Sequence, residues 1–419
     1  MNQIVISKAH KSLIGCISLP ASKSESNRAL MIKAMCQEGI LIQNLSDAED
    51  TQILNKCLRY IETCGFSGIP MVVDAKNAGT VYRFLTAYLA IRSGKWLLIG
   101  SERMQERPIE QLVLALNQIN ADISYTDKKG YPPLLINGKK LKGGQLNLES
   151  GISSQYITAL LLIAPLLNNG LEIQLVGNLI SRPYVQMTIK IMEHFGVEVD
   201  YSDRLIKIEH QTYAKNVFTV SPDWSAASYW YEMVALSDEV DFLIPDLKKE
   251  SMQGDRVLPV IFDQLGVSSE FTLEGLKLKK QNRKVNYFEY DFIDCPDLAQ
   301  AVIVTCVGLG IEGSFKGLQS LRIKETDRIA SLNNEIRLFG FSLVEENPTL
   351  WNLIKHSEDF NFPINHVVNT YNDHRMAMSL APLCLLTNKL IIEDPEVVKK
   401  SYPGFWKDLE SVGFKIDRL

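Results

Sequence analysis

Two carboxylates in this sequence stand where acid–base chemistry beside anionic groups is possible. Asp297 follows a proline where a helix is expected to begin, and Glu325 lies between the cations Lys324 and Arg328. Neighbouring cations lower the pKa of such a carboxyl, whereas burial or a nearby phosphate raises it. Each residue also has an ordinary alternative: Asp297 could be only a helix N-cap, and Glu325 could be only an i,i+3 partner of Arg328.

Cationic side chains gather beside the expected first turns of several helices, although the formal net charge of the chain is -5. This set consists of Lys23, Arg107, Lys324 and Arg375. A cation there normally costs about 0.3–1 kcal/mol, because the N-terminal end of a helix carries partial positive charge. Because this unfavourable placement of a cation is repeated, we expect an anion to bind at these turns. Arginine grips carboxylate or phosphate with paired hydrogen bonds and lysine acts as a compact charge, so we expect ligands that carry both groups.

One pattern recurs six times along the chain: an alternating strand-like segment, a short polar turn and an apolar helix. The turns are marked by Lys23, Asn77, Ser153, Asp223, Asp297 and Asp373, which are 54, 76, 70, 74 and 76 residues apart. Repetition at a nearly fixed period indicates one copied unit. We therefore expect an α/β protein with three copies in each of two lobes. The short first spacing predicts that one copy lacks about twenty residues, or two strands.

The ends of the expected helices carry two kinds of signal. Each first helix should begin with Ser, Asp or Asn as its N-cap, and such helix starts still leave backbone N–H groups that attract anions. A second amphipathic helix recurs in several copies and is followed by Gly196, Gly266, Gly340 or Gly413. Glycine is favoured there because it adopts the left-handed conformation without a Cβ clash. The G-x-G-x-x-G stretch at 308–313 ends an apolar helix, so we interpret it as a helix-to-strand turn and not as a dinucleotide site.

Composition excludes several classes of protein. The net charge of -5 argues against nucleic acid as the main partner. No stretch approaches the ~20 apolar residues of a membrane span, and the N-terminal segment is too polar for a signal peptide. The seven cysteines form no CxxC pair and no Cys/His cluster, so we expect reduced thiols, no structural metal and a cytoplasmic location.

Ten segments, read in order along nearly the whole chain, resemble the 5-enolpyruvylshikimate-3-phosphate synthase family. They are ASKSESNRAL, NAGTVYRFL, ERPI, SSQ, SRPY, DWSAAS, PDLA, LRIKETDRI, YNDHRMAM and KSYPGFW, of which DHRMAM and KETDR are the most specific. The resemblance implies a two-lobed enolpyruvyl transferase fold, each lobe made of three βαβαββ repeats in an inside-out α/β barrel. It places one lobe at 1–20 plus 222–419 and the other at 21–221, with a hinge near Pro20 and Ser221.

The same resemblance implies a reaction. Such enzymes close around shikimate 3-phosphate and phosphoenolpyruvate, and transfer the enolpyruvyl group to the 5-hydroxyl of the acceptor by addition and elimination of phosphate. This step belongs to the shikimate pathway to aromatic amino acids. It requires no metal or other cofactor, and we expect a monomer whose only partners are its small-molecule substrates.

Site residues follow from the family's motifs, position by position. Those implied for shikimate 3-phosphate are Lys23, Ser24, Arg28, Ser153, Ser154, Gln155, Ser181, Tyr184, Asp297 and Lys324. Those implied for phosphoenolpyruvate are Lys23, Gly79, Arg107, Gln155, Arg328, Arg375 and Lys400, with Asn77, Thr80 and His374 in support. Asp297 matches the acceptor of the hydroxyl proton. Glu325 or Lys23 matches the group that protonates the methylene carbon, and the choice between them stays open.

The sequence also departs from the family and leaves two rival functions. Tyr82 and Phe84 replace smaller or different residues, and we expect them to flank the phosphoenolpyruvate pocket. One rival is UDP-N-acetylglucosamine enolpyruvyl transferase, whose family has a Cys before its Arg-Pro; the stretch from Gly94 to Arg107 has none here. The other rival is an anion-binding homologue without catalysis, against which Asp297, Glu325 and Lys23 together speak.

Overall fold

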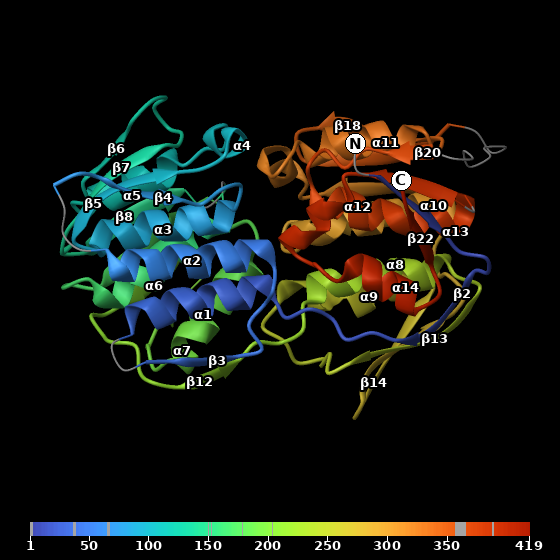
Figure 1. Ribbon diagram of the computed structural model, residues 1–419, viewed down its shortest axis with the longest axis horizontal. Helices are drawn as coiled ribbons and strands as arrows, with labels where there is room; N and C mark the ends of the chain where they lie inside the picture. Colours follow the sequence, from blue (N-terminus) through green and yellow to red (C-terminus); the bar gives the residue numbers. More distant parts are fainter. Residues whose placement is uncertain are drawn as a thin grey trace. The chain divides into compact units, whose positions relative to one another are not determined.

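The computed structural model describes residues 3–36, 39–64, 68–149, 151, 153–177, 179–202, 204–356, 366–387 and 389–419. The chain divides into two compact units. Unit 1 comprises Met1–Ala21 and Ser221–Leu419, and unit 2 comprises Ser22–Val220. Each unit is a mixed α/β structure that contains three copies of one motif (Figure 1).

The second copy of unit 2 displays the motif in full. Its elements are β4 (Met71–Asp74), α3 (Gly79–Ile91), β5 (Gly94–Ile99), α5 (Glu110–Gln118), β6 (Ile123–Tyr125) and β7 (Leu134–Gly138). The sheet order is β4-β5-β7-β6, and only β4 and β5 run parallel. Parallel neighbours require a crossover, which α3 supplies. The third copy repeats this order with β8 (Gly144–Glu149), α6 (Ser154–Ile163), β9 (Leu171–Val176), α7 (Arg182–His194), β10 (Asp200–Tyr201) and β11 (Leu205–Ile208).

The first copy of unit 2 is the reduced one. It consists of α1 (Lys23–Met35), β3 (Leu41–Gln43), α2 (Glu49–Thr63) and β12 (Val217–Thr219). Its sheet has the two strands β12 and β3, whereas the sheets of the other copies have four. The short spacing of 54 residues at the first repeat predicted this loss of two strands, and the prediction is confirmed.

Unit 1 contains three complete copies. The first has β2 (Ser12–Cys16), α8 (Trp224–Leu236), β13 (Glu239–Pro245), α9 (Leu258–Gln264), β14 (Val267–Thr272) and β15 (Gly275–Lys280). The second has β16 (Tyr287–Asp291), α10 (Ala299–Leu309), β17 (Glu312–Lys316), α11 (Arg328–Arg337), β18 (Phe341–Asn347) and β19 (Leu350–Lys355). The third has β20 (His366–Val368), α12 (His374–Leu380), β21 (Lys389–Glu393), α14 (Phe405–Ser411), β22 (Lys415–Arg418) and, from the start of the chain, β1 (Gln3–Ser7).

Two copies exchange their first strands where the chain passes from one unit to the other. β2 precedes α1 in the sequence but pairs in parallel with β13 of unit 1. Conversely, β12 precedes α8 but pairs with β3 of unit 2. The repeat pattern by itself places each of these strands next to the helix that follows it, whereas the lobe bounds implied by the family resemblance, 1–20 plus 222–419 and 21–221, separate β2 from α1 and β12 from α8. The spacing of the strands and their pattern of polar and apolar residues would be the same in both arrangements. Only the observed pairing of β2 with β13 and of β12 with β3 distinguishes the two.

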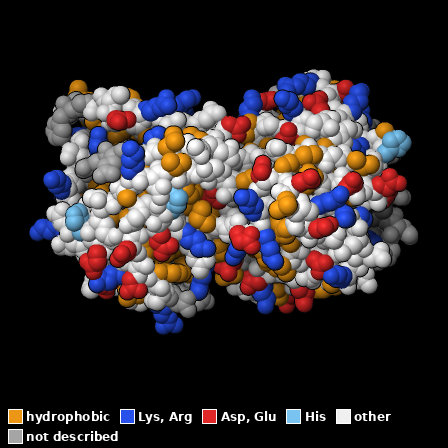
Figure 2. All heavy atoms as spheres, turned by 90° about the horizontal axis from the view of Figure 1, so that it is seen from below, with side chains coloured by type: hydrophobic (Ala, Val, Ile, Leu, Met, Phe, Trp, Pro, Cys, Tyr) orange, Lys and Arg blue, Asp and Glu red, His pale blue; other side chains and the backbone are white. Residues whose placement is uncertain are grey.

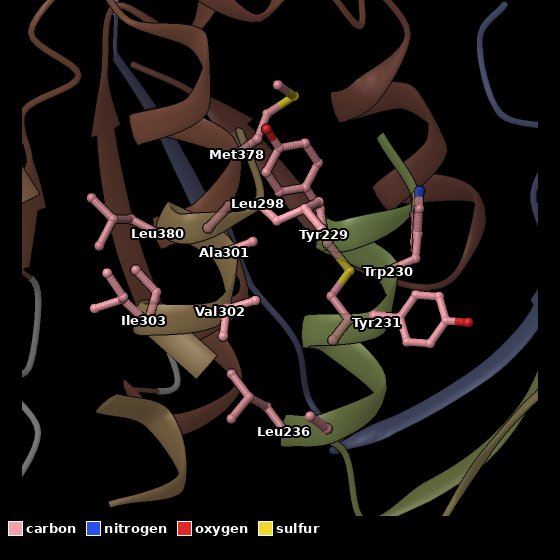
Figure 3. Packing of buried hydrophobic residues seen from close by; sticks show 14 of the residues in the cluster. Tyr229, Trp230, Tyr231, Leu236, Leu298, Ala301, Val302, Ile303, Met378 and Leu380 are labelled. Carbon is pink, nitrogen blue, oxygen red and sulfur yellow. The ribbon is translucent and has the colours of Figure 1, made fainter. Parts of the chain in front are cut away.

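The first helices of the three copies form the interior of unit 1. Every residue of α8 except Ser225 is buried, and the helices that pack against it are buried over Ala299–Val307 of α10 and the whole of α12. Figure 3 shows buried apolar side chains of α8, α10 and α12, of which Tyr229, Ala301 and Val302 lie between α8 and α10. The sheets lie outside them, since their strands alternate between buried and more exposed residues, as in β19 and β21. The unit therefore has its helices inside and its sheets outside, which is the predicted inside-out arrangement.

Local signals at the helix ends are largely as predicted. Gly196, Gly266, Gly340 and Gly413 have φ of 81°, 94°, 79° and 88°, so each adopts the left-handed conformation after its helix. Gly310 caps α10 with φ 72°, and β17 begins two residues later, which confirms a helix-to-strand turn at 308–313.

Other general features of the chain are simple. All seven cysteines are free, and four of them are buried. None of the helices in the described ranges has the length and apolar character that crossing a bilayer requires. Figure 2 shows basic and acidic side chains interspersed over the face of each unit that it presents.

Candidate active site

Asp297 lies at the centre of the charged cluster of unit 1. It sits in a short 3-10 turn, Pro296–Leu298, directly before α10. Its Oδ1 is 3.2 Å from Nη1 of Arg328 and 3.7 Å from Nζ of Lys324, and its Oδ2 is 3.0 Å from Nη2 of Arg375. Three cations therefore converge on one carboxylate that is 19% exposed.

This environment decides the ionisation of Asp297. Burial raises the pKa of the carboxyl, but the charges of Arg375, Lys324 and Arg328 outweigh burial and hold the pKa well below its usual range. The N-cap alternative for Asp297 is wrong, because the residue that caps α10 is Leu298. Asp297 is therefore ionised. Its basicity depends on how strongly Arg375, Lys324 and Arg328 also interact with other anionic groups.

Arg328 is the most enclosed member of the cluster. Its side chain is 2% exposed, at the first position of α11. Besides Asp297 it contacts two further carboxylates: its Nη2 is 2.8 Å from Oε2 of Glu325, and its Nε is 2.6 Å from Oδ2 of Asp373. Burial lowers the pKa of the guanidinium, but Asp373, Glu325 and Asp297 raise it above the ordinary value. A fixed positive charge therefore lies where turns of two neighbouring copies meet.

Glu325 is held by two cations. Besides the i,i+3 contact with Arg328, its Oε1 is 3.4 Å from Nζ of Lys400. Glu325 therefore does form the i,i+3 ion pair with Arg328, and its carboxylate also lies beside Lys400. Lys400 ends the 3-10 helix Pro395–Lys400 and is itself buried. Both residues belong to the predicted site, and unit 1 brings them together.

The first turn of α12 connects this cluster to the next copy. Asp373 is the N-cap, and its Oδ1 accepts a hydrogen bond from the backbone N–H of Arg375 at 2.9 Å. The Arg375 guanidinium donates to Tyr229 and to the backbone carbonyl of Asp297, at 3.3 Å and 3.0 Å. His374 is buried, with Nδ1 3.5 Å from Asp373. The DHR sequence thus supplies a cap, a buried imidazole and a carboxylate-binding arginine in three consecutive residues.

The helix starts of the two units differ in charge. In unit 1, carboxylates stand at or beside the starts of α8, α10 and α12, namely Asp223, Asp297 and Asp373. In unit 2, α1 and α6 are capped by the hydroxyls of Ser22 and Ser153, and α3 begins after Ala78. The prediction that Asn77 caps α3 was wrong, since it lies one residue earlier in the turn. The positive helix ends of unit 2 therefore carry no carboxylate cap, and these are the ends better suited to bind anions directly.

Arg107 and Gly79 come together in unit 2. A Cβ atom at Gly79 would lie 2.6 Å from both Nη1 and Nη2 of Arg107, so the guanidinium rests on the first residue of α3. Thr80, the next residue, accepts a hydrogen bond from Nε2 of Gln155 at 3.0 Å. Three of the predicted phosphoenolpyruvate residues and the supporting Thr80 thus lie at one helix start.

Lys23 is positioned by a carboxylate that sequence reasoning did not select. It is the first residue of α1, and its Nζ is 3.2 Å from Oδ2 of Asp50, in the first turn of α2. Both side chains are largely buried. Acidic residues are common in first turns, so the sequence offered no signal that this one reaches Lys23.

A buried hydrogen-bond network surrounds Arg28, a predicted ligand of shikimate 3-phosphate. The guanidinium donates to Oγ1 of Thr188 at 2.8 Å and to the backbone carbonyls of Ser24 and Tyr184 at 2.9 Å and 3.2 Å. Burial lowers the pKa of Arg28 to about 10. These hydrogen-bond partners are neutral groups of α1 and α7, and the negative charge of Glu25 also acts on the guanidinium.

The remaining predicted residues of unit 2 lie at two helix starts. Ser153 caps α6 by accepting from the N–H of Gln155 at 3.3 Å, and Ser154 is the first residue of that helix. Ser181 precedes α7 in the left-handed conformation, with φ 57°, and Tyr184 follows in its first turn. Hydroxyl groups therefore flank the starts of both helices.

Sequence reasoning also missed Asp255 of unit 1. This buried carboxyl accepts a hydrogen bond from Oγ of Ser225 at 2.5 Å. Burial and the nearby negative charge of Asp297 raise its pKa to about 7. It lies in the 3-10 helix Gly254–Val257 between β13 and α9, where no charge pattern in the sequence marks it.

The two unusual residues of α3, Tyr82 and Phe84, are both buried. The hydroxyl of Tyr82 donates to the carbonyl of Leu98 at 2.9 Å, within the sheet of its own copy. Phe84 places its ring 5.8 Å from the guanidinium carbon of Arg28. Tyr82 is thus hydrogen-bonded to β5 and Phe84 lies near Arg28, and the expectation that both flank the phosphoenolpyruvate pocket stays a prediction.

Comparison with known proteins gives consistent results. The family model described as EPSP synthase (3-phosphoshikimate 1-carboxyvinyltransferase) matches residues 7–409. The 3-phosphoshikimate 1-carboxyvinyltransferase of Bacteroides fragilis is 45% identical over 401 residues, which cover 96% of this chain and 95% of the relative. The Haemophilus influenzae enzyme of the same name is 32% identical over 431 residues, covering 96% and 97%.

Solved structures show the same fold at low sequence identity. The EPSP synthase of Acinetobacter baumannii has a TM-score of 0.75 at 19% identity and covers 100% of both chains. The enolpyruvyl transferase NikO of Streptomyces tendae has a TM-score of 0.76 at 14% identity, covering 100% of this chain and 99% of that one. The structural likeness establishes the two-lobed fold, and the sequence matches establish more: this chain belongs to the EPSP synthase (3-phosphoshikimate 1-carboxyvinyltransferase) family.

Proposed function

We propose that this protein transfers the enolpyruvyl group of phosphoenolpyruvate to the 5-hydroxyl of shikimate 3-phosphate and releases phosphate. The observation that carries the proposal is the carboxylate of Asp297 held by Arg328, Lys324 and Arg375. A base surrounded by cations suits two anionic reactants, because the same cations that hold the base also bind the phosphate and carboxylate groups. Membership of the family supports the choice of substrates.

Asp297 acts in this proposal as the acceptor of the hydroxyl proton. In the unliganded cluster its pKa is well below the usual range because of Arg375, Lys324 and Arg328. Such a carboxylate is a weak base. Substrate anions that engage Lys324 and Arg375 would reduce the positive field at Asp297 and raise its pKa towards the value a base requires. Binding and base activation are thus coupled through the same two cations.

The bond changes balance without any cofactor. The acceptor oxygen bonds to C2 of phosphoenolpyruvate as Asp297 takes its proton, while C3 gains a proton and becomes a methyl group. The C2–O bond to phosphate then breaks as C3 loses a proton, which leaves the enol ether and free phosphate. Glu325 and Lys23 are the candidates for proton transfer at C3. Glu325 lies beside Lys400 at 3.4 Å, and Lys23 lies beside Asp50 at 3.2 Å, so each has a charged partner.

The proposed ligand residues are divided between the units. Unit 2 supplies Lys23, Arg28, Arg107 and the hydroxyls at the starts of α6 and α7, whereas unit 1 supplies Lys324, Arg328, Arg375 and Lys400. The proposal therefore requires the substrates to draw the units onto one ligand set, with a hinge near Pro20 and Ser221. Closure of this kind would exclude water and protect the tetrahedral intermediate. X-ray scattering should show a smaller radius of gyration when shikimate 3-phosphate and a phosphoenolpyruvate analogue are added.

The decisive experiment measures phosphate release from phosphoenolpyruvate with each acceptor separately. We expect release with shikimate 3-phosphate and none with UDP-N-acetylglucosamine. Release with the sugar nucleotide alone would assign the protein to the rival transferase. No release with either acceptor, together with binding of both proposed substrates, would identify an anion-binding homologue without catalysis.

A cytoplasmic, monomeric enzyme completes the proposal. Free thiols at all seven cysteines are compatible with a reducing compartment. Sedimentation over a range of protein concentrations tests the monomer, and fractionation of cells that produce the protein tests the location.

A further inference from the structure

Arg83 and Tyr156 make a second layer behind the residues proposed to bind phosphoenolpyruvate. Arg83 lies one helical turn after Gly79 in α3, and Tyr156 lies in the first turn of α6. Both are buried, at 4% and 2% exposure. Neither belongs to the ligand sets inferred from the family's motifs.

Both side chains bond to the backbone that carries Arg107. The carbonyl oxygen of Pro108, the next residue, accepts from the hydroxyl of Tyr156 at 2.6 Å and from Nη2 of Arg83 at 3.4 Å. The other terminal nitrogen of Arg83, Nη1, donates to the carbonyl of Gly79 at 3.0 Å. One guanidinium therefore connects the start of α3 to the Arg107–Pro108 segment, and Tyr156 connects α6 to the same carbonyl.

The guanidinium of Arg83 is also close to that of Arg107. A Cβ atom at Gly79 would lie 2.6 Å from Nη1 of Arg83 as well as from both terminal nitrogens of Arg107. The ring of Tyr156 lies 5.5 Å from the guanidinium carbon of Arg83. In the described part of the chain, the atoms that accept hydrogen bonds from Arg83 are neutral carbonyl oxygens. Its charge is thus left uncompensated next to the proposed anion site, which is where a bound phosphate or carboxylate would use it.

We infer that Arg83 and Tyr156 are positioning residues that fix Arg107 for phosphoenolpyruvate. This inference rests on the proposed function and names two residues that its ligand sets omit. Arg107 follows the short helix Glu102–Gln105, and the segment that carries it cannot rely on Pro108 for a backbone N–H donor. The hydrogen bonds that Tyr156 and Arg83 donate to the Pro108 carbonyl hold this segment in place instead. A guanidinium placed about 1 Å away from its position loses much of its effect on a bound ligand.

The test compares three variants with the wild type in the phosphate-release assay. Tyr156→Phe removes one donor to Pro108 and changes no charge. Arg83→Lys keeps the charge but cannot bond to two carbonyls in a fixed fork. Tyr213→Phe is the matched control, because the buried hydroxyl of Tyr213 also donates to a backbone carbonyl of unit 2, that of Leu162, at 2.8 Å.

We expect Tyr156→Phe and Arg83→Lys each to raise the KM for phosphoenolpyruvate about three- to tenfold, the effect of losing one buried hydrogen bond. The KM for shikimate 3-phosphate should stay within about twofold, and Tyr213→Phe should leave both constants unchanged. Thermal unfolding of each variant accompanies the kinetics, and Tyr156→Phe and Tyr213→Phe should lower Tm to a similar degree.

Three results would overturn the inference. They are an unchanged phosphoenolpyruvate KM in Tyr156→Phe, an equal rise of both substrate constants, and wild-type behaviour of Arg83→Lys, which would mean that charge alone suffices. A wild-type protein that releases no phosphate with shikimate 3-phosphate would instead refute the proposed function, so the two failures are distinguishable.

Discussion

The guanidinium of Arg328 and the carboxylate of Asp373 form a buried pair, with Nε 2.6 Å from Oδ2 and Nη2 3.4 Å from Oδ1. The side chains are 2% and 0% exposed. Arg328 begins the second helix of one copy, whereas Asp373 caps the first helix of the next. The remaining hydrogen-bonding capacity of the guanidinium is directed to Asp297 and Glu325. This pair therefore holds both proposed catalytic carboxylates in place.

Asp373→Asn should destabilise the protein by about 3 kcal/mol, because it leaves a buried guanidinium without its main counter-charge. Asparagine is as good an N-cap as aspartate, so the loss reports the ion pair and not the cap. The free energy of unfolding in urea measures it. Asp327→Asn is the control, since Asp327 caps α11 but pairs with Arg322 at the surface, at 3.5 Å. We expect it to change stability by less than about 0.5 kcal/mol. Equal effects in both variants would contradict the role given to the buried pair.

Asp297→Asn should keep the fold and lower turnover by about 10²–10⁴, the usual contribution of a positioned base. The amide has nearly the same shape as the carboxylate but cannot take the hydroxyl proton. Single-turnover phosphate release measures the chemical step, and circular dichroism checks the fold. Asp291→Asn, six residues earlier at the end of β16, serves as the control. A near-normal rate in Asp297→Asn would show that another group removes the proton.

Gly79→Ala should raise the KM for phosphoenolpyruvate about ten- to hundredfold with little change in stability. The new methyl group would lie 2.6 Å from the terminal nitrogens of Arg107 and from Nη1 of Arg83, so both guanidiniums must move. Alanine suits the first position of a helix, which is why the fold should tolerate it. Steady-state kinetics with each substrate varied in turn separate the two sites. Gly68→Ala is the control, because a Cβ there meets no atom within 4 Å. Unchanged kinetics in Gly79→Ala would show that Arg107 does not act from its observed position.

Glu232→Gln should stabilise the protein more at pH 8 than at pH 5. Glu232 lies in the interior of α8, and its carboxyl oxygens have no hydrogen-bond partner in the described residues. Burial raises its pKa well above the usual range, so the folded protein keeps the proton that the unfolded chain releases near pH 4.3. Stability is therefore lost as the pH rises above that value, by about 1.4 kcal/mol per pH unit up to the folded pKa.

Urea unfolding of the wild type and Glu232→Gln at the two pH values measures this difference. Glu289→Gln, on β16 at the surface, should give the same small effect at both. A pH-independent difference for Glu232→Gln would mean that this carboxyl is ionised in the folded protein.

Sequence alone determined the repeat, its shortened first copy, the glycines that end the second helices and the turns that carry the charged residues. These features are local, because a cap or a left-handed glycine depends on residues a few positions away. The same locality explains two errors: whether Asn77 or Ala78 is the N-cap of α3, and whether Asp297 caps α10, depends on about one residue of helix extent.

Tertiary structure alone decided which charges meet. Asp297 is 31 and 78 residues from Arg328 and Arg375, and the sequence gives no reason to choose these partners over others. Tertiary structure also decided three other contacts. They are the exchange of β2 and β12 between copies, the contact of Asp50 with Lys23, and the hydrogen bonds of Arg83 and Tyr156 to Pro108. Each depends on the packing of segments that lie far apart along the chain, whereas residue type and spacing describe only what is near.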